Sequence, residues 1–192
     1  MRLFVAIELA DEVRKRLRHV QDTLKRPRDR IKWVRPELMH VTLKFLGEVT
    51  DADAVGDAVE AAASRTERFA LAINGCGCFP VKGPVRAMWA GVTEPTGTLA
   101  RCVEEIEAEL ETIGFPREHR PFSPHITLAR VREDRSEGKL RTAVDTAKLG
   151  PLDQPVAGVA VMSSVLGSDG PAYSVVRRVS LGERNPNPAK RC

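Results

Sequence analysis

Residues 39–47 read MHVTLKFLG, and residues 124–130 repeat the pattern in shortened form as PHITLAR. Each copy contains a histidine, a β-branched residue, a threonine and a leucine in that order. An Arg-Pro pair stands five residues before each of the two histidines. We interpret the two copies as an internal duplication, which predicts two halves that fold alike.

Both copies are rich in residues that favour β-strands, and side chains alternate between the two faces of a strand. In the first copy this alternation places His40, Thr42 and Lys44 on one face. Phe45 falls on the opposite face with the apolar residues, although stacking on a base stays open as a role for it. Each copy thus presents an imidazole beside a hydroxyl, backed by an apolar face.

In the second copy the same alternation places His125 and Thr127 on one face and Arg130 on the opposite, core face. Two alternatives stay open for the arginine. Either the strand ends or bulges near Ala129, or Arg130 serves another role. Lys44 of the first copy has no basic counterpart, because Ala129 occupies the equivalent position.

Two histidine–threonine pairs suit acid–base chemistry on a phosphodiester. Histidine titrates near neutral pH, so one imidazole can be protonated while the other is neutral, as concerted acid–base catalysis requires. Threonine hydroxyls can donate hydrogen bonds to a charged intermediate. A lone strand histidine is more often structural, but the duplicated pair favours catalysis. We therefore expect His40, Thr42, His125 and Thr127 to meet in one site.

The two H-x-T-x motifs, residues 40–43 and 125–128, make the sequence resemble the 2H phosphoesterase superfamily. The flanking segments WVRP at residues 33–36 and KFLGE at residues 44–48 resemble those of the bacterial and archaeal RNA 2′,3′-cyclic phosphodiesterases, also called 2′-5′ RNA ligases. The resemblance extends from Arg2 to about Leu181.

The resemblance implies a hydrolase that converts RNA 2′,3′-cyclic phosphate ends to 2′-phosphomonoesters, with 2′-5′ RNA ligation as the reverse reaction. It implies that His40 is the proton donor, that His125 is the proton acceptor and that Arg130 helps to bind phosphate. Lys44 and Phe45 are further candidates for substrate binding. We expect no metal and no cofactor, and the sequence has no G-x-x-x-x-G-K-[ST] loop for ATP.

Two other classes of function stay open. A noncatalytic RNA-binding module would explain the basic segment at residues 25–30, which could steer an RNA backbone or be an ordinary solvated loop. It would not explain the paired histidines. A metal hydrolase would use His40 and His125 as ligands, but the sequence lacks a compact ligand cluster such as H-E-x-x-H.

The composition is that of an ordinary globular protein, with 42% hydrophobic and 29% charged residues. The net charge of +4 is compatible with a nucleic-acid substrate. The N-terminus does not resemble a signal peptide, and no run approaches the roughly 20 apolar residues of a membrane span. We expect a cytoplasmic monomer without a membrane anchor, whose four cysteines, Cys76, Cys78, Cys102 and Cys192, are reduced.

The mixture of strands and helices without strict alternation predicts an α+β fold with antiparallel sheets. The resemblance adds two pseudo-symmetric lobes, each an antiparallel sheet with helices packed outside, and an active-site cleft between the lobes. We expect one bilobal domain over residues 1–182 and a frayed tail over residues 183–192. Besides the two motif strands, we expect strands at residues 2–9, 69–79, 85–92, 156–166 and 173–181, and helices at residues 11–25, 53–65, 98–113 and 136–148.

Overall fold

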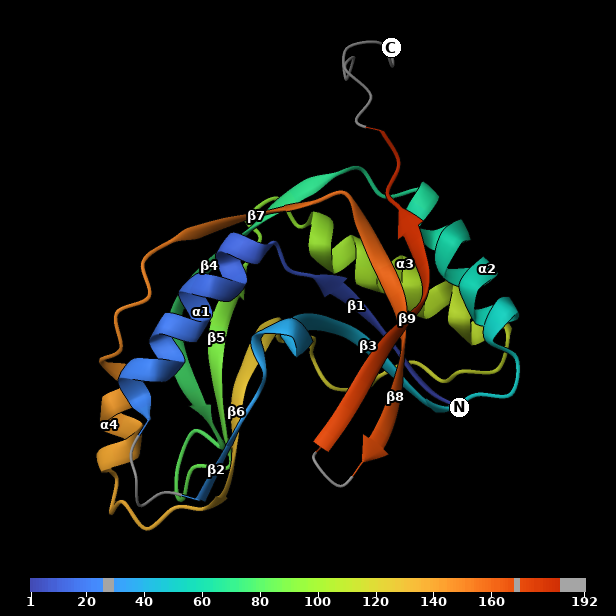
Figure 1. Cartoon of the computed structure of the whole chain (residues 1–192). Coiled ribbons are helices and arrows are strands. Elements are labelled where there is room, and N and C mark those ends of the chain that lie inside the picture. The colour runs from blue at the N-terminus through green and yellow to red at the C-terminus, as the bar shows by residue number, and fades with distance from the viewer. Residues whose placement is uncertain (26–29, 168–169, 184–192) are drawn as a thin grey trace.

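The computed structural model describes residues 1–25, 30–167 and 170–183. This part of the chain forms a curled antiparallel sheet with helices packed outside it, so the expected α+β class is confirmed (Figure 1). The elements are β1 (Arg2–Glu8), α1 (Asp11–Leu24), β2 (Arg30–Trp33), a short 3-10 turn (Pro36–Leu38), β3 (His40–Glu48), α2 (Ala52–Ser64), β4 (Phe69–Phe79), β5 (Ala87–Thr93), α3 (Thr98–Thr112), β6 (His125–Glu133), α4 (Lys139–Asp145), β7 (Leu152–Val156), β8 (Gly158–Gly167) and β9 (Gly170–Ser180).

The sheet consists of two lobes that meet at the motif strands. Its order is β7-β4-β5-β6-β3-β1-β8-β9, and β2 also pairs with β6. We call the strands β3, β1, β8 and β9 the first lobe, and β6, β5, β4, β7 and β2 the second lobe. Helices α2 and α3 cover the first lobe, whereas α1 and α4 cover the second (Figure 1). The expected pseudo-symmetric arrangement is therefore confirmed.

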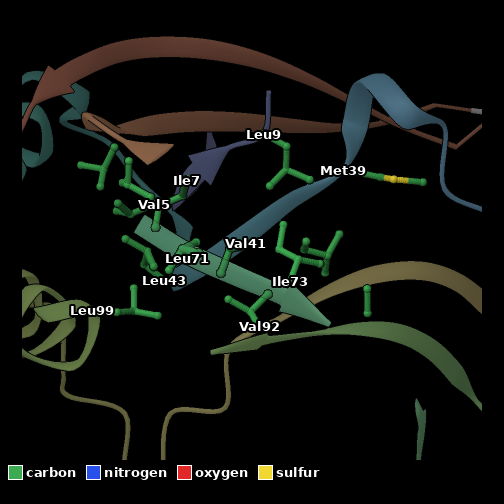
Figure 2. Packing of buried hydrophobic residues seen from close by; sticks show 14 of the residues in the cluster. Val5, Ile7, Leu9, Met39, Val41, Leu43, Leu71, Ile73, Val92 and Leu99 are labelled. Atoms are coloured by element: carbon green, nitrogen blue, oxygen red, sulfur yellow. The ribbon is translucent and has the colours of Figure 1, made fainter. Parts of the chain in front are cut away.

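The two lobes share one hydrophobic core. Val41 of β3 is fully buried in a cluster that also contains residues of both lobes and of α3. Figure 2 shows Val41 and Leu43 of the first lobe in the same cluster as Ile73 and Val92 of the second. The chain also passes repeatedly between the lobes, since β1 is followed by α1 on the other lobe. The lobes are thus joined both by the sheet and by the packing beneath it.

Two strands were not expected from the sequence. The short β2 and β7 lie beside β6 and β4 and have few apolar residues. Helix α2 is capped by Asp51, whose carboxylate accepts a hydrogen bond from the backbone N–H of Ala54 at 3.0 Å. None of the helices within the described ranges is long and apolar enough to cross a membrane.

Both motif strands contain a β-bulge at the leucine that follows the threonine. In β3, the pairing with β1 steps from Thr42 directly to Lys44 and leaves Leu43 as an extra residue. In β6, the pairing with β5 skips Leu128, the equivalent leucine. A bulge inserts one residue, so it reverses the faces of the side chains that follow it, in β3 as far as a second irregularity at Leu46. The two halves share this irregularity as well as the motif.

A buried glutamine of α1 supports the second bulge. Gln21 is only 2% exposed, and its side-chain amide donates hydrogen bonds to the backbone carbonyls of Val34 and Leu128, each at 2.8 Å. The carbonyl of Leu128 also accepts the backbone N–H of Val34 at 2.9 Å. Buried carbonyls need such donors because they have lost water. Helix α1 therefore stabilises the backbone beside the second motif.

Replacing this glutamine tests its contribution. Gln21→Met keeps a similar length but removes both donated bonds, so it should lower the free energy of unfolding by about 1–3 kcal/mol. The measurement is urea denaturation, with the exposed Glu12→Gln of the same helix as control and an expected change within about 0.5 kcal/mol. Equal stability of the two variants would contradict a supporting role for Gln21.

Candidate active site

A single residue pair joins the two motif strands. Val41 of β3 pairs with Ile126 of β6, and both side chains are completely buried on the core face. The residues on either side of this pair therefore point to the opposite face, which we call the motif face. The antiparallel register places His40 opposite Thr127, and it places Thr42 opposite His125.

This register arranges the four side chains as the corners of a quadrilateral. The two histidines occupy one diagonal, since His125 lies two residues from the position opposite His40. Diagonal neighbours in an antiparallel pair are about 7–8 Å apart. Such a separation leaves room for a phosphate group between the imidazoles, with one ring on each side of it.

Both imidazoles are oriented by the same kind of hydrogen bond. Nδ1 of His40 lies 2.7 Å from the carbonyl oxygen of Leu38, and Nδ1 of His125 lies 2.8 Å from that of Ser123. A carbonyl oxygen only accepts, so each Nδ1 carries a proton and donates it. In a neutral ring, Nε2 then has the free lone pair. Each Nε2 is thus the atom that can exchange a proton.

The hydroxyl of Thr42 lies 3.0 Å from Nε2 of His40, and in the neutral ring it donates to that nitrogen. Burial lowers the pKa of His40, and the positive charge of His125 lowers it further, while the bond to the carbonyl of Leu38 opposes both effects. His40 is therefore held mainly in its neutral form in the free protein near pH 7.

Aromatic rings flank each histidine. The ring of His40 contacts those of Phe4 and Tyr173, at centroid distances of 4.9 and 5.4 Å, and these two rings also contact each other at 5.1 Å. The ring of His125 meets the edge of Phe79 at 5.3 Å. Nothing in the local sequence around the motifs marks Phe4 or Tyr173, which are brought to His40 only by strand pairing. Neither residue was therefore predicted from the sequence.

The bulge at Leu43 overturns the faces expected for Lys44 and Phe45. Lys44 is 6% exposed on the core face, where its ammonium group pairs with Glu107 of α3. The prediction that it shares a face with His40 was wrong, because strict alternation fails at the bulge, and this burial speaks against the predicted role in substrate binding. Phe45 lies on the motif face instead, is 72% exposed, and has its ring 6.0 Å from that of Phe4.

The bulge at Leu128 decides between the two alternatives for Arg130. It turns Arg130 away from the core to the exposed motif face. Lys32 of β2 lies directly opposite Arg130 and is also exposed. Within the described ranges neither cation pairs with a carboxylate, whereas Arg135 nearby pairs with Glu133 at 2.7 Å. The second lobe therefore presents free positive charge beside the second motif.

Other predicted features contribute less to the site. Four residues of the basic segment at 25–30, namely residues 26–29, lie outside the described part of the chain, as does Cys192. Burial raises the pKa of the Cys76 and Cys78 thiols to about 11, which disfavours the thiolate that a metal would bind. The described residues contain no group of three or more His, Cys, Asp or Glu side chains arranged to hold a metal.

Comparisons with known proteins agree with this geometry. Residues 7–89 and residues 91–173 each match the family described as LigT like phosphoesterase, so one match falls on each half of the chain. The chain is 36% identical to an RNA 2′,3′-cyclic phosphodiesterase of Thermus thermophilus, and the alignment covers 94% of this chain and 90% of the relative.

Solved structures show the same fold. The Thermus thermophilus protein TT0787 superposes with a TM-score of 0.81 at 30% identity, covering 96% of this chain and all of that one. E. coli LigT complexed with 3′-AMP superposes with a TM-score of 0.72 at 26% identity, covering 94% of this chain and 97% of that one.

The environment of His40 predicts how it titrates. Its pKa in the free protein should lie below the ordinary value of about 6.5, because burial and His125 both disfavour the charged ring. His125→Ala removes the neighbouring positive charge and should raise the pKa of His40. The measurement is an NMR titration of the ring nitrogens, with His19→Ala on α1 as control. An unchanged pKa of His40 in His125→Ala would contradict coupling between the rings.

Proposed function

The chain belongs to the LigT-like phosphoesterase family, and we propose that it hydrolyses RNA 2′,3′-cyclic phosphate ends to 2′-phosphomonoesters. The observation that carries the proposal is the diagonal pair of imidazoles, both anchored through Nδ1 to a backbone carbonyl two residues upstream. The name of the Thermus thermophilus relative supports this choice of substrate. Binding of 3′-AMP by E. coli LigT supports a nucleotide ligand.

In the proposed reaction, His125 and His40 move one proton each. Neutral His125 accepts a proton through Nε2 from a water molecule that attacks phosphorus. Protonated His40 donates a proton to O3′ as the P–O3′ bond breaks, so the phosphate stays on O2′. The hydroxyls of Thr42 and Thr127 donate hydrogen bonds to the phosphate oxygens as negative charge builds up on them.

The difference between the two lobes supports this division of roles. Phe45 and Arg130 follow their motif threonines by three residues each, and both are exposed on the motif face. An exposed aromatic ring suits stacking on a base, and a guanidinium suits a phosphate. We therefore place the nucleoside on the first lobe and the phosphate oxygens toward the second.

The position of the nucleoside decides which histidine protonates the leaving oxygen. The attacking and leaving oxygens lie roughly in line on opposite sides of phosphorus. O3′ belongs to the nucleoside and so lies toward the first lobe, beside His40. Water then attacks from the second lobe, beside His125. The difference between the lobes thus favours the same proton donor, His40, and the same acceptor, His125, as the family resemblance does.

The lowered pKa of His40 has to be reconciled with a role as proton donor. A bound phosphate is negatively charged, and a nearby negative charge raises the pKa of an imidazole. Substrate binding would therefore protonate His40, so binding takes up a proton. By linkage, affinity for an anionic ligand should rise as the pH falls between two values, the pKa of His40 in the complex and its lower pKa in the free protein.

The free cations support an RNA substrate over a free nucleotide. Lys32 and Arg130 lie side by side at the edge of the motif face, where they could contact the phosphates of the nucleotides that precede the cyclic end. We further propose that the protein acts as a cytoplasmic monomer and that 2′-5′ ligation uses the same groups. In ligation the 5′-hydroxyl of a second RNA end attacks phosphorus in place of water, His125 accepts its proton, and His40 protonates O3′ as the P–O3′ bond breaks.

The deciding experiment is product analysis with a 2′,3′-cyclic phosphate-ended oligonucleotide and with 2′,3′-cyclic AMP. The 2′-phosphomonoester should form, and His40→Ala and His125→Ala should each lower turnover by roughly 10²–10⁴. His19→Ala serves as the control, since His19 is exposed on α1 and far from both motifs in sequence. A folded His40→Ala or His125→Ala with near-normal turnover would overturn the mechanism.

The same assay separates the two other classes of function. A noncatalytic RNA-binding module would bind the oligonucleotide without releasing product. A metal hydrolase would lose activity in excess chelator and regain it only with added divalent ion, whereas the proposed reaction should be unaffected.

An activated leaving group separates the roles of the two histidines. A diester with a p-nitrophenyl leaving group hardly needs a proton donor, so it should largely rescue His40→Ala. The same substrate should leave His125→Ala slow, because the attacking water still needs a base. The measurement is the ratio of turnover on this diester to turnover on the cyclic substrate for each variant. Rescue of His125→Ala alone would reverse the assignment, and equal rescue would refute any division of roles.

A further inference from the structure

The buried ion pair of Lys44 and Glu107 has no part in the proton transfers proposed above. Lys44 is 6% exposed and Glu107 is 8% exposed, so both charged groups have been removed from water. Such pairs are often no more stabilising than apolar side chains of similar volume. The equivalent position of the second motif contains the buried Ala129, which shows that the bulged strand does not itself require a charge here.

The pair is bonded to the loop that leads into the second motif. The ammonium group of Lys44 also donates to the carbonyl oxygen of Pro116 at 2.8 Å, and the carboxylate of Glu107 accepts the backbone N–H of Glu118 at 3.3 Å. Both partners belong to the segment of residues 113–124, which connects α3 to β6. Here we call this segment the entry loop. The first motif is thereby tied to the chain just before the second.

The entry loop provides the atom that orients His125. Its residue Ser123 offers the carbonyl oxygen that accepts the Nδ1 proton of His125. His40 donates its equivalent bond to the carbonyl oxygen of Leu38, which lies in a different segment and has no hydrogen bond to the ion pair within the described ranges. A shift of the entry loop should therefore affect the orientation of His125 and leave His40 unchanged.

We propose that Lys44 and Glu107 are positioning residues, which fix the entry loop and through it the ring orientation of His125. The proposal rests on the function proposed above, in which His125 accepts the proton of water. The bond to Ser123 selects the ring form in which Nδ1 carries the proton and Nε2 is free to accept one. Without that selection, part of the protein would present a protonated Nε2 to water and would be inactive.

The proposal is tested by two variants that should change stability and activity in opposite directions. Lys44→Met with Glu107→Leu keeps the buried volume but removes both hydrogen bonds that the ion pair makes to the entry loop, and its stability should match or exceed that of the parent. Glu107→Gln keeps oxygen as an acceptor for Lys44 and Glu118 but leaves a buried charge unpaired, so its stability should fall. If the ion pair only stabilised the fold, Glu107→Gln would be both the less stable and the less active of the two variants.

The expected kinetics follow from the position of His125. The double variant should lose about 10-fold to 100-fold in kcat with little change in KM, because a misplaced catalytic group affects the transition state more than binding. Glu107→Gln should retain most of its kcat under conditions in which it is folded. A third variant, Lys44→Met with Glu107→Gln, keeps only the acceptor for Glu118. Its kcat should lie between those of the other two variants.

The direct readout is the ring form of each histidine in the free protein, measured from its ¹⁵N chemical shifts. In the double variant His125 should become a mixture of the two neutral ring forms, while His40 should keep its single form. An unchanged ring form of His125 in the double variant would overturn the proposal, and so would an equal change in both histidines. This measurement needs no turnover, so it remains decisive even if the parent fails to hydrolyse a cyclic phosphate.

Discussion

The pairing of Val41 with Ile126 is the contact on which the rest of the structure depends. It is where the sheets of the two lobes become one sheet, and it places both apolar side chains in a common core. The alternation of a strand then turns the neighbouring His40, Thr42, His125 and Thr127 to the other face. One residue pair thus fixes both the union of the lobes and the separation of the two imidazoles, so neither can change without the other.

The two β-bulges determine what surrounds these four side chains. Each bulge reverses the faces of the side chains that follow its motif. In β3 this buries Lys44 and exposes Phe45, and in β6 it buries Ala129 and exposes Arg130. The two copies of the motif therefore share a backbone conformation but expose different kinds of side chain. The first lobe offers an aromatic surface, with Phe45 next to Phe4. The second offers Arg130 and Lys32, which pair with no carboxylate in the part of the chain that the structure describes. An asymmetric substrate such as a nucleotide needs this difference, because a fully symmetric site would bind it in two orientations.

The surface charges follow a related pattern. Elsewhere on the described surface, many arginines are neutralised by carboxylates. Arg177, for example, pairs with Asp57 and Glu60 at 2.6 and 2.5 Å, and Arg178 pairs with Glu8 at 2.7 Å. Arg130 and Lys32 lack such partners within the described ranges. Exposed ion pairs contribute little to stability, so this contrast concerns where a polyanion can bind more than how the fold is held together.

The sequence by itself determined the α+β class, the duplication and the four motif residues, because these depend on local composition and on a pattern that occurs twice. It also left the bulge at Ala129 open as one explanation of Arg130. Only the tertiary structure decided the faces of Lys44 and Phe45, since a bulge depends on pairing with another strand and leaves no mark in the alternation of residues. The same holds for Tyr173, which reaches His40 through the pairing of β9 with β8 and of β8 with β1. Glu107 is placed beneath the first motif by the packing of α3 against β3. Contacts between residues far apart in the chain depend on how the elements pack, and no local pattern encodes that packing.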